Sequence, residues 1–161
     1  MINKEEILRD LNKDPKAFLV DGIWYYGGLL NKRNPNKLIS NAYRIWCDQG
    51  DRCNNRNSKA FKDYGAKNIQ RIWTSREFVD WYVNELLKKD YWDFPHVSRI
   101  RDEGNYSLDN CFIQERLDNI KEMHINKYVK RDKNLINKVI NILEKYKIDI
   151  KIIDEIRVLE G

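Results

Sequence analysis

The segment from His96 to Ile113, "HVSRIRDEGNYSLDNCFI", gathers side chains of different chemistry around one short turn. His96 carries an imidazole that can accept a proton near neutral pH, and Asp102 offers a carboxylate to a cation. Arg99 differs from both, because a guanidinium stays protonated in proteins and can hold a phosphate but cannot act as a base. The segment therefore predicts proton transfer, cation binding and phosphate contact, with His96 as the candidate base.

Two strands and a helix must position these side chains. Residues 97–100 and 111–114 are typical of strands, and the turn between them has Gly104 at its tip. The apolar residues after Gln114 recur at helical spacing, which predicts a helix there. In such a β-β-α unit, a side chain at the end of the first strand can meet another side chain one turn into the helix.

The same segment belongs to a longer pattern between Ile39 and Lys121. A basic helix comes first, then "RCNN", "FKDYG", an aromatic helix, a strand, "DEGNYSLDNC" and "QERLDNIK". In this order the pattern resembles the small HNH-endonuclease-like proteins that are common in phages. The resemblance implies a ββα-metal fold, DNA or RNA as the partner, and Mg²⁺ or Mn²⁺ as the cofactor of an active enzyme.

The resemblance also assigns roles by position. Asn110 stands where the family has an Asn that orients its general base, and Asn119 stands where the helix supplies a metal ligand. These two positions match the family pattern. Ser98 stands in place of the metal-binding carboxylate, and Arg99 stands in place of the general base, so the pattern lacks the group that activates water.

Two nearby residues are candidates to replace the missing groups. His96 lies two residues before Ser98, so the two side chains share one face of the strand. Asp102 lies in the turn, close enough to reach the same space. The alternative is a packing or surface His beside Pro95 and an Asp in ordinary turn chemistry. The candidate site residues are, for catalysis, His96, Arg99 and Asn110, and, for metal binding, Asn119 and Asp102.

Basic residues are interleaved with aromatic residues between Arg44 and Arg76. The chain has a net charge of +5 and an isoelectric point near 9.0, which suits a polyanionic partner. In such a mixture the cations neutralise phosphates and the rings stack on bases. The alternative is a solvated basic face over an aromatic core. The candidate nucleic-acid-binding residues are Arg44, Arg52, Arg56, Lys59, Lys62, Lys67, Arg71 and Arg76.

Length and composition predict one compact domain with an appendage. We expect an α+β fold that is mostly helical, with a small β-β-α (HNH-like) unit and a helical C-terminal extension. The predicted divisions are an N-terminal helix and aromatic strand or turn in residues 1–38, an HNH-endonuclease-like domain in residues 39–125, and the extension in residues 126–161.

Local signals place several elements. Helices are predicted at residues 3–13, along the stripe of Ile39, Tyr43 and Trp46, at 75–89 after a Thr74–Glu77 capping box, and at 134–146. The stretch "GIWYYGG" at Gly22–Gly28 predicts an aromatic strand or turn. The tail from residue 147 fits either a strand or a short helix.

The sequence also argues against several classes. No run approaches the roughly 20 apolar residues of a membrane span, and the N-terminus has no apolar signal segment, so a cytoplasmic location is expected. Cys47, Cys53 and Cys111 are odd in number and contain no CxxC pair, which argues against a disulfide scaffold and a four-ligand zinc site. We expect reduced, mostly buried thiols.

Two classes of function remain from the resemblance. One is metal-dependent nicking or cleavage of DNA. The other is a catalytically silent HNH-like fold that binds DNA or inhibits a host defence nuclease, of the anti-CRISPR or anti-restriction type. A basic inhibitor cannot mimic DNA, so it would cover an acidic surface or compete for the guide or target strand.

Overall fold

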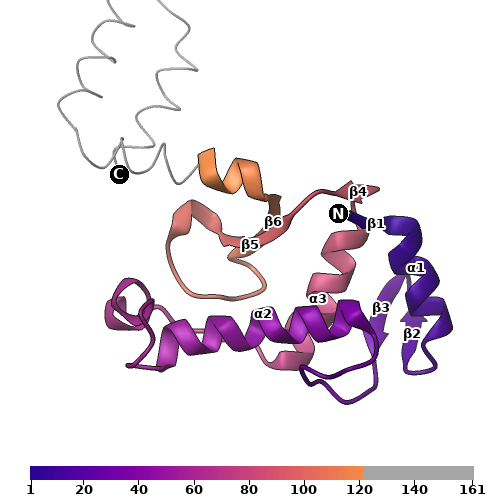
Figure 1. Cartoon of the computed structure of the whole chain (residues 1–161), viewed down its shortest axis with the longest axis horizontal. Coiled ribbons are helices and arrows are strands. Elements are labelled where there is room, and N and C mark those ends of the chain that lie inside the picture. Colours follow the sequence, from indigo (N-terminus) through magenta and orange to yellow (C-terminus); the bar gives the residue numbers. More distant parts are fainter. Residues whose placement is uncertain (122–161) are drawn as a thin grey trace, which may run out of the picture. The chain divides into compact units, whose positions relative to one another are not determined.

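The computed structural model describes residues 1–121, which combine helices with short antiparallel strands (Figure 1). The mixed α+β class predicted from the sequence is confirmed. The predicted helix at 134–146 and the ambiguous tail lie outside the described residues. Within residues 1–121, no helix has the length and apolar content needed to cross a membrane.

The elements follow one another closely along the chain. In order they are β1 (Ile2–Asn3), α1 (Lys4–Lys13), β2 (Ala17–Val20), β3 (Ile23–Tyr26), α2 (Lys37–Asn54), the 3-10 helices η1 (Phe61–Asp63) and η2 (Gly65–Lys67), α3 (Ser75–Leu87), β4 (Tyr91–Trp92), β5 (Pro95–Arg99), the 3-10 helix η3 (Ile100–Asp102) and β6 (Cys111–Glu115). A further helix begins at Arg116. Met1–Arg116 form one compact unit, so residues 1–38 share a unit with most of residues 39–125, and a second unit begins at Leu117.

The three longer helices begin at residues that suit a helix N-terminus. The Asn36 side chain accepts hydrogen bonds from the first backbone N–H groups of α2. The predicted capping box of α3 is present, with Thr74 and Glu77 each satisfying the backbone of the other. The predictions for residues 3–13 and 75–89 are confirmed to within two residues.

The hairpin of β2 and β3 turns in two residues. Asp21 and Gly22 both have positive φ, 50° and 80°, and Asp-Gly is the dipeptide that such a tight turn favours. The predicted aromatic strand is therefore β3. Its partner β2 is an element that the sequence analysis does not predict, although the Asp-Gly turn signals it.

The free edge of β3 is closed by side chains from α3. Asn84 accepts from the Trp24 N–H at 2.9 Å and donates to the Trp24 carbonyl at 2.8 Å. Asp80 accepts from the Tyr26 N–H at 3.1 Å, and Arg76 donates to the Tyr26 carbonyl. Because Arg76, Asp80 and Asn84 are four residues apart, one helix face takes the place of a third strand.

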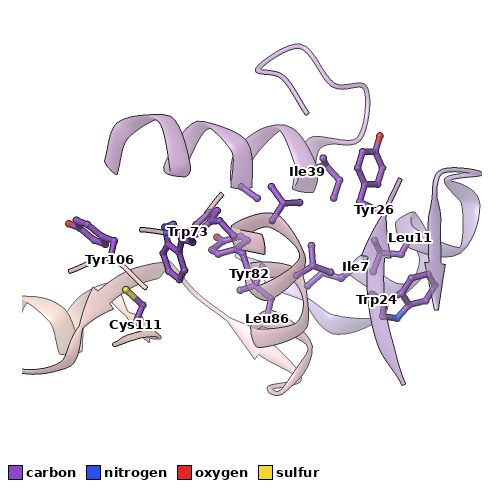
Figure 2. Close-up of a cluster of buried hydrophobic side chains, with 14 of the residues drawn as sticks. Ile7, Leu11, Trp24, Tyr26, Ile39, Trp73, Tyr82, Leu86, Tyr106 and Cys111 are labelled. Carbon is purple, nitrogen blue, oxygen red and sulfur yellow. The ribbon is translucent and has the colours of Figure 1, made fainter. Parts of the chain in front are cut away.

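The core lies where α1, β3, α2 and α3 meet (Figure 2). Tyr82 and Leu86 from α3 and Ile39 from α2 are fully buried, and Leu11 from α1 is 2% exposed. Tyr43 and Trp46 of α2 are half-buried against this cluster, so the predicted apolar stripe of α2 faces the core only in part. Burying aromatic and aliphatic side chains from several elements is what holds the hairpins in place.

Candidate functional site

The candidate site is built on the hairpin of β5 and β6. The strands pair antiparallel, with His96 opposite Gln114 and Arg99 opposite Cys111. The strands predicted at 97–100 and 111–114 are confirmed, although β5 starts earlier, at Pro95, and Ile100 already belongs to η3. The order strand, loop, strand, helix is therefore present in the described part of the chain.

The strand register separates the side chains onto two faces. His96, Ser98, Phe112 and Gln114 share one face, because opposite residues in an antiparallel pair point to the same side. Arg99 lies on the other face with Cys111, and both are buried. The two residues that the resemblance assigns to the reaction, Ser98 and Arg99, thus point in opposite directions.

Ser98 lies in a neutral hydrogen-bonded pair. The Gln114 side-chain N–H donates to the Ser98 hydroxyl, with Nε2 and Oγ 2.7 Å apart. An amide and a hydroxyl carry no net charge, and Mg²⁺ and Mn²⁺ favour charged oxygen ligands. This pair stands where the family has a carboxylate, and it does not replace that carboxylate chemically.

His96 lies on the same face as Ser98 and is exposed to solvent. Two effects lower the pKa of His96 from its ordinary value of 6.5. The larger is partial desolvation of the imidazole, and the smaller is the nearby positive charge of Arg116. The ring is therefore mostly neutral at pH 7 and able to accept a proton.

Arg99 points into the protein. Its side chain is only 3% exposed, Nη1 donates to the Gly104 carbonyl at 2.7 Å, and Nη2 donates to Asp102 Oδ1 at 2.6 Å. The guanidinium also lies 5.3 Å from the ring centre of Tyr64 and 5.1 Å from that of Tyr106. The predicted phosphate contact would require Arg99 to leave these partners.

Asn110 holds the same loop from its other end. Its side-chain Nδ2 donates to the carbonyls of Glu103 and Asn105, both at 2.8 Å. Its own carbonyl accepts from the Ile100 N–H at 3.0 Å. Asn110 therefore ties together the two ends of the loop, and its role of orienting a general base stays a prediction.

The loop needs these tethers because its backbone is unusual. Arg101 and Asp102 both have positive φ, 54° and 55°, and Gly104 follows with 67°. Each non-glycine residue in this region costs about 1 kcal/mol. The bonds from Arg99 and Asn110 stabilise a conformation that the chain would not adopt alone.

The two predicted metal ligands, Asp102 and Asn119, belong to different units of the chain. The Asp102 carboxylate is the only carboxylate among the site residues of the first unit, and one of its oxygens is paired with Arg99. Asn119 lies on the helix that begins at Arg116, in the second unit, and each unit is described by itself. In residues 1–121, no three His, Cys, Asp or Glu side chains gather as a group that could hold a metal ion. The metal-binding roles of Asp102 and Asn119 stay predictions.

Three of the eight predicted nucleic-acid-binding residues contact protein groups. Arg71 lies on the Trp46 ring, 3.5 Å from its centre, and donates to the Trp46 carbonyl at 2.7 Å. Arg52 donates to the Tyr106 hydroxyl at 3.3 Å and lies over Tyr64. Arg76 is bound to β3, as described above. These contacts fasten loops and strands to the helices.

The other five predicted residues are exposed. Arg44 lies on α2. The remaining four follow α2 closely and define what we call the exposed basic segment, namely Arg56, Lys59, Lys62 and Lys67. Lys67 lies 3.9 Å from Asp63, an ion pair between two exposed side chains that solvent weakens. Together with Arg44, this segment supplies exposed cations of the predicted basic surface.

Sequence reasoning did not identify Tyr64 and Tyr106 as part of the site. Their rings stack 6.2 Å apart, and burial raises the pKa of Tyr106, so its hydroxyl is neutral and accepts from Arg52. Both tyrosines stand in the stretches "FKDYG" and "GNYS" that carried the resemblance. Their contact with Arg99 joins segments far apart in the chain, which no local pattern indicates.

Comparison of the chain with protein family models, with curated proteins and with solved structures finds no match. The resemblance drawn from residues 39–121 therefore stays a proposal, to be judged on the geometry of the site.

Proposed function

We propose that this chain is a nucleic-acid-binding protein built on a catalytically silent HNH-like β-β-α unit. The observation that carries the proposal is the state of Arg99, which stands at the position of the general base. Its guanidinium is 3% exposed and is bound to Asp102 and Gly104. A group that never loses its proton, and that is already occupied by the loop, supports shape rather than water activation.

The neighbouring positions support the same conclusion. The hydroxyl of Ser98 accepts from Gln114, and the carboxylate of Asp102 is paired with Arg99. Neither group offers a free negative charge for a divalent cation. Mg²⁺ or Mn²⁺ therefore belongs to the enzymatic alternative and not to the function proposed here.

The exposed basic segment is the surface that we assign to DNA. Its four cations follow the end of α2, and within residues 1–121 the one ion pair that involves them joins Lys67 to Asp63. Long, solvated Lys and Arg side chains bind phosphates mainly through release of counterions, so their contribution depends on salt rather than on base sequence.

The first test measures binding of a labelled DNA duplex by fluorescence anisotropy as the salt concentration rises. We expect affinity to fall steeply with salt, and replacing Lys59 and Lys62 together with Ala to reduce the slope of log K against log salt by about 2. The matched control replaces Arg9 and Lys13 of α1, which removes the same charge elsewhere and should leave the slope nearly unchanged.

Two results would contradict this assignment. One is an equal loss of slope in the α1 control. The other is no binding at low salt, or binding that salt does not affect, which would favour a protein partner such as a host defence nuclease.

One observation favours a second candidate, metal-dependent nicking of DNA. His96 is exposed, its pKa is lowered, and it shares the face of Ser98, so one neutral imidazole is available as a base. The test is incubation with supercoiled plasmid and Mg²⁺ or Mn²⁺, with and without a chelator. We expect no nicking. Chelator-sensitive nicking that His96→Ala and Asn119→Ala each abolish would replace the silent fold with an enzyme.

A further inference from the structure

The outward face of the β2–β3 hairpin is apolar. Trp24 and Tyr26 point into the core, so the alternate residues of both strands point away from it. On that side Phe18 and Val20 are each 49% exposed, and Ile23 is 46% exposed. An antiparallel sheet normally turns polar side chains to solvent, so this face is unusual for a surface of a monomer.

The outer edge of β2 is open, in contrast to the edge of β3 that α3 closes. The Gly27 N–H donates to the Lys16 carbonyl, so Lys16 and Gly27 form a hydrogen-bonded pair. Because hydrogen-bonded and non-hydrogen-bonded pairs alternate along an antiparallel ladder, the Leu19 N–H and carbonyl point away from β3. Within residues 1–121, the Leu19 backbone groups make no hydrogen bond, and Leu19 is 54% exposed.

The β2 strand also lacks the residue types that commonly prevent strands from pairing between molecules. Ala17–Val20 reads "AFLV", without a Lys, a Pro or any other polar residue. Natural edge strands are commonly protected by such residues or by a bulge. An open, apolar edge of this kind accepts another strand readily.

We propose that β2 pairs antiparallel with β2 of a second copy of this chain, about a two-fold axis at Leu19. The Leu19 N–H of each copy donates to the Leu19 carbonyl of the other, as in a hydrogen-bonded antiparallel pair. Phe18 then lies opposite Val20 of the second copy, at the closely spaced, non-hydrogen-bonded position. The two hairpins become one four-stranded sheet.

Charge favours a second copy in this orientation. Lys16 precedes β2 and Asp21 follows it, so antiparallel pairing brings the basic start of one strand near the acidic end of the other. Parallel pairing would bring Lys16 beside Lys16. The residues of β2 itself carry no charge, so pairing two copies of β2 places no like charges opposite each other.

The strand is short, so the expected dimer is weak. Its contact area falls below the roughly 800 Å² per partner of a standard interface. We therefore expect a dissociation constant on the order of 10–100 μM rather than a permanent dimer.

The test uses the full chain without DNA, in sedimentation velocity runs from about 1 μM to about 300 μM, a range that spans the expected dissociation constant. A reversible monomer–dimer equilibrium is expected. Hydrogen exchange followed residue by residue should show the Leu19 amide becoming slower as the protein concentration rises, because only the dimer gives that amide an acceptor.

Two variants and one control make the test specific. Leu19→Pro removes a donor that the monomer does not use, and Val20→Lys places a charge in the paired strands; each should keep the circular dichroism spectrum and abolish the dimer. Leu29→Lys changes an equally apolar residue that is 72% exposed outside the hairpin, and it should leave the dimer intact. A chain that stays monomeric at all concentrations, or a dimer that persists in both folded variants, overturns the proposal.

Discussion

The two hairpins of the first unit, β2–β3 and β5–β6, reach the same strand pairing by different means. The first turns through Asp21 and Gly22, whose conformations suit a tight turn, and its support comes from side chains of α3. The second encloses a long loop with strained residues. Arg99 and Asn110 hold this loop from within the hairpin, and backbone hydrogen bonds between Tyr106 and the segment before α3 hold it from outside.

The difference has a functional meaning. In β2–β3 the turn sequence sets the register, so the side chains of the hairpin are left for the core and for the surface. In β5–β6 the polar side chains of Arg99 and Asn110 are used to hold the loop. Under the function proposed above, this hairpin keeps the shape of the site while its polar groups are bound to its own loop.

The largest effect on stability is expected for Arg99→Ala. This change removes two hydrogen bonds from a charged donor and the contacts with Tyr64 and Tyr106, and it leaves the Gly104 carbonyl without its partner. We expect the free energy of unfolding, measured by urea denaturation, to fall by about 3 kcal/mol. Arg44→Ala, at an exposed position, should change it by less than about 0.5 kcal/mol. Similar small losses for both variants would mean that Arg99 does not hold the loop.

A somewhat smaller loss is expected when the external support of the other hairpin is removed. Asn84→Ala leaves the Trp24 N–H and carbonyl without hydrogen bonds in a partly buried place. Urea denaturation should show a loss of about 2 kcal/mol. The control Lys88→Ala breaks only an exposed ion pair with Glu85 and should cost almost nothing. If Asn84→Ala leaves the free energy of unfolding unchanged, the turn alone is sufficient to hold the β2–β3 hairpin.

Two glycines with positive φ sharpen the comparison further. Gly22 has φ of 80° and open space around the position of a Cβ atom, so Gly22→Ala should cost only the backbone strain of about 1 kcal/mol. At Gly104 a Cβ would lie 2.9 Å from Asn110 Nδ2, so Gly104→Ala must also displace the loop tether. We expect Gly104→Ala to be the costlier by about 1 kcal/mol in thermal or urea unfolding. Equal costs would argue that Asn110 adjusts freely.

The smallest effect concerns pH. Partial burial raises the pKa of Asp80 above its ordinary value of 3.8, against the opposing effects of the Tyr26 N–H and Arg76. The folded state then binds this proton more readily than the unfolded state, so the contribution of Asp80 to stability falls as pH rises from about 4 and is regained as pH falls.

Asp80→Asn keeps an oxygen for the Tyr26 N–H and removes the titration. The variant should gain stability relative to the original chain between about pH 4 and pH 7, by a few tenths of a kcal/mol after solvent screening (roughly 0.3). Urea denaturation at several pH values measures this difference. A difference that does not change with pH would show that Asp80 has the same pKa in both states.

The elements with local signals were predictable from the sequence. The capping box at Thr74 and Glu77 marked α3, and the Gly104 turn between two apolar runs marked β5 and β6. The dipeptide Asp21-Gly22 is also a local signal, and it indicates a hairpin whose first strand is β2, an element that the sequence analysis above does not predict.

The direction of the basic side chains was not predictable. Arg52, Arg71 and Arg76 stand among exposed cations of the same type, yet each binds a ring or a carbonyl of the protein. The partners of Arg76 lie far away in sequence, on β3, and periodicity carries no information about such contacts. The residue types around the β5–β6 loop could be read from the chain, whereas the use of Arg99 as a tether required the fold.

The ladder between α3 and β3 also sets a limit on length. Four helical residues advance about 6.0 Å, whereas two strand residues advance about 6.6 Å, so successive rungs drift apart by roughly 0.6 Å. With hydrogen bonds at only two strand residues, Trp24 and Tyr26, this difference in rise stays within the range of hydrogen-bond lengths. Each further bonded residue would increase the difference. The helix α3 therefore fixes the position of the β2–β3 hairpin and limits the length of β3, because a longer strand would have to curve to stay bonded to the helix.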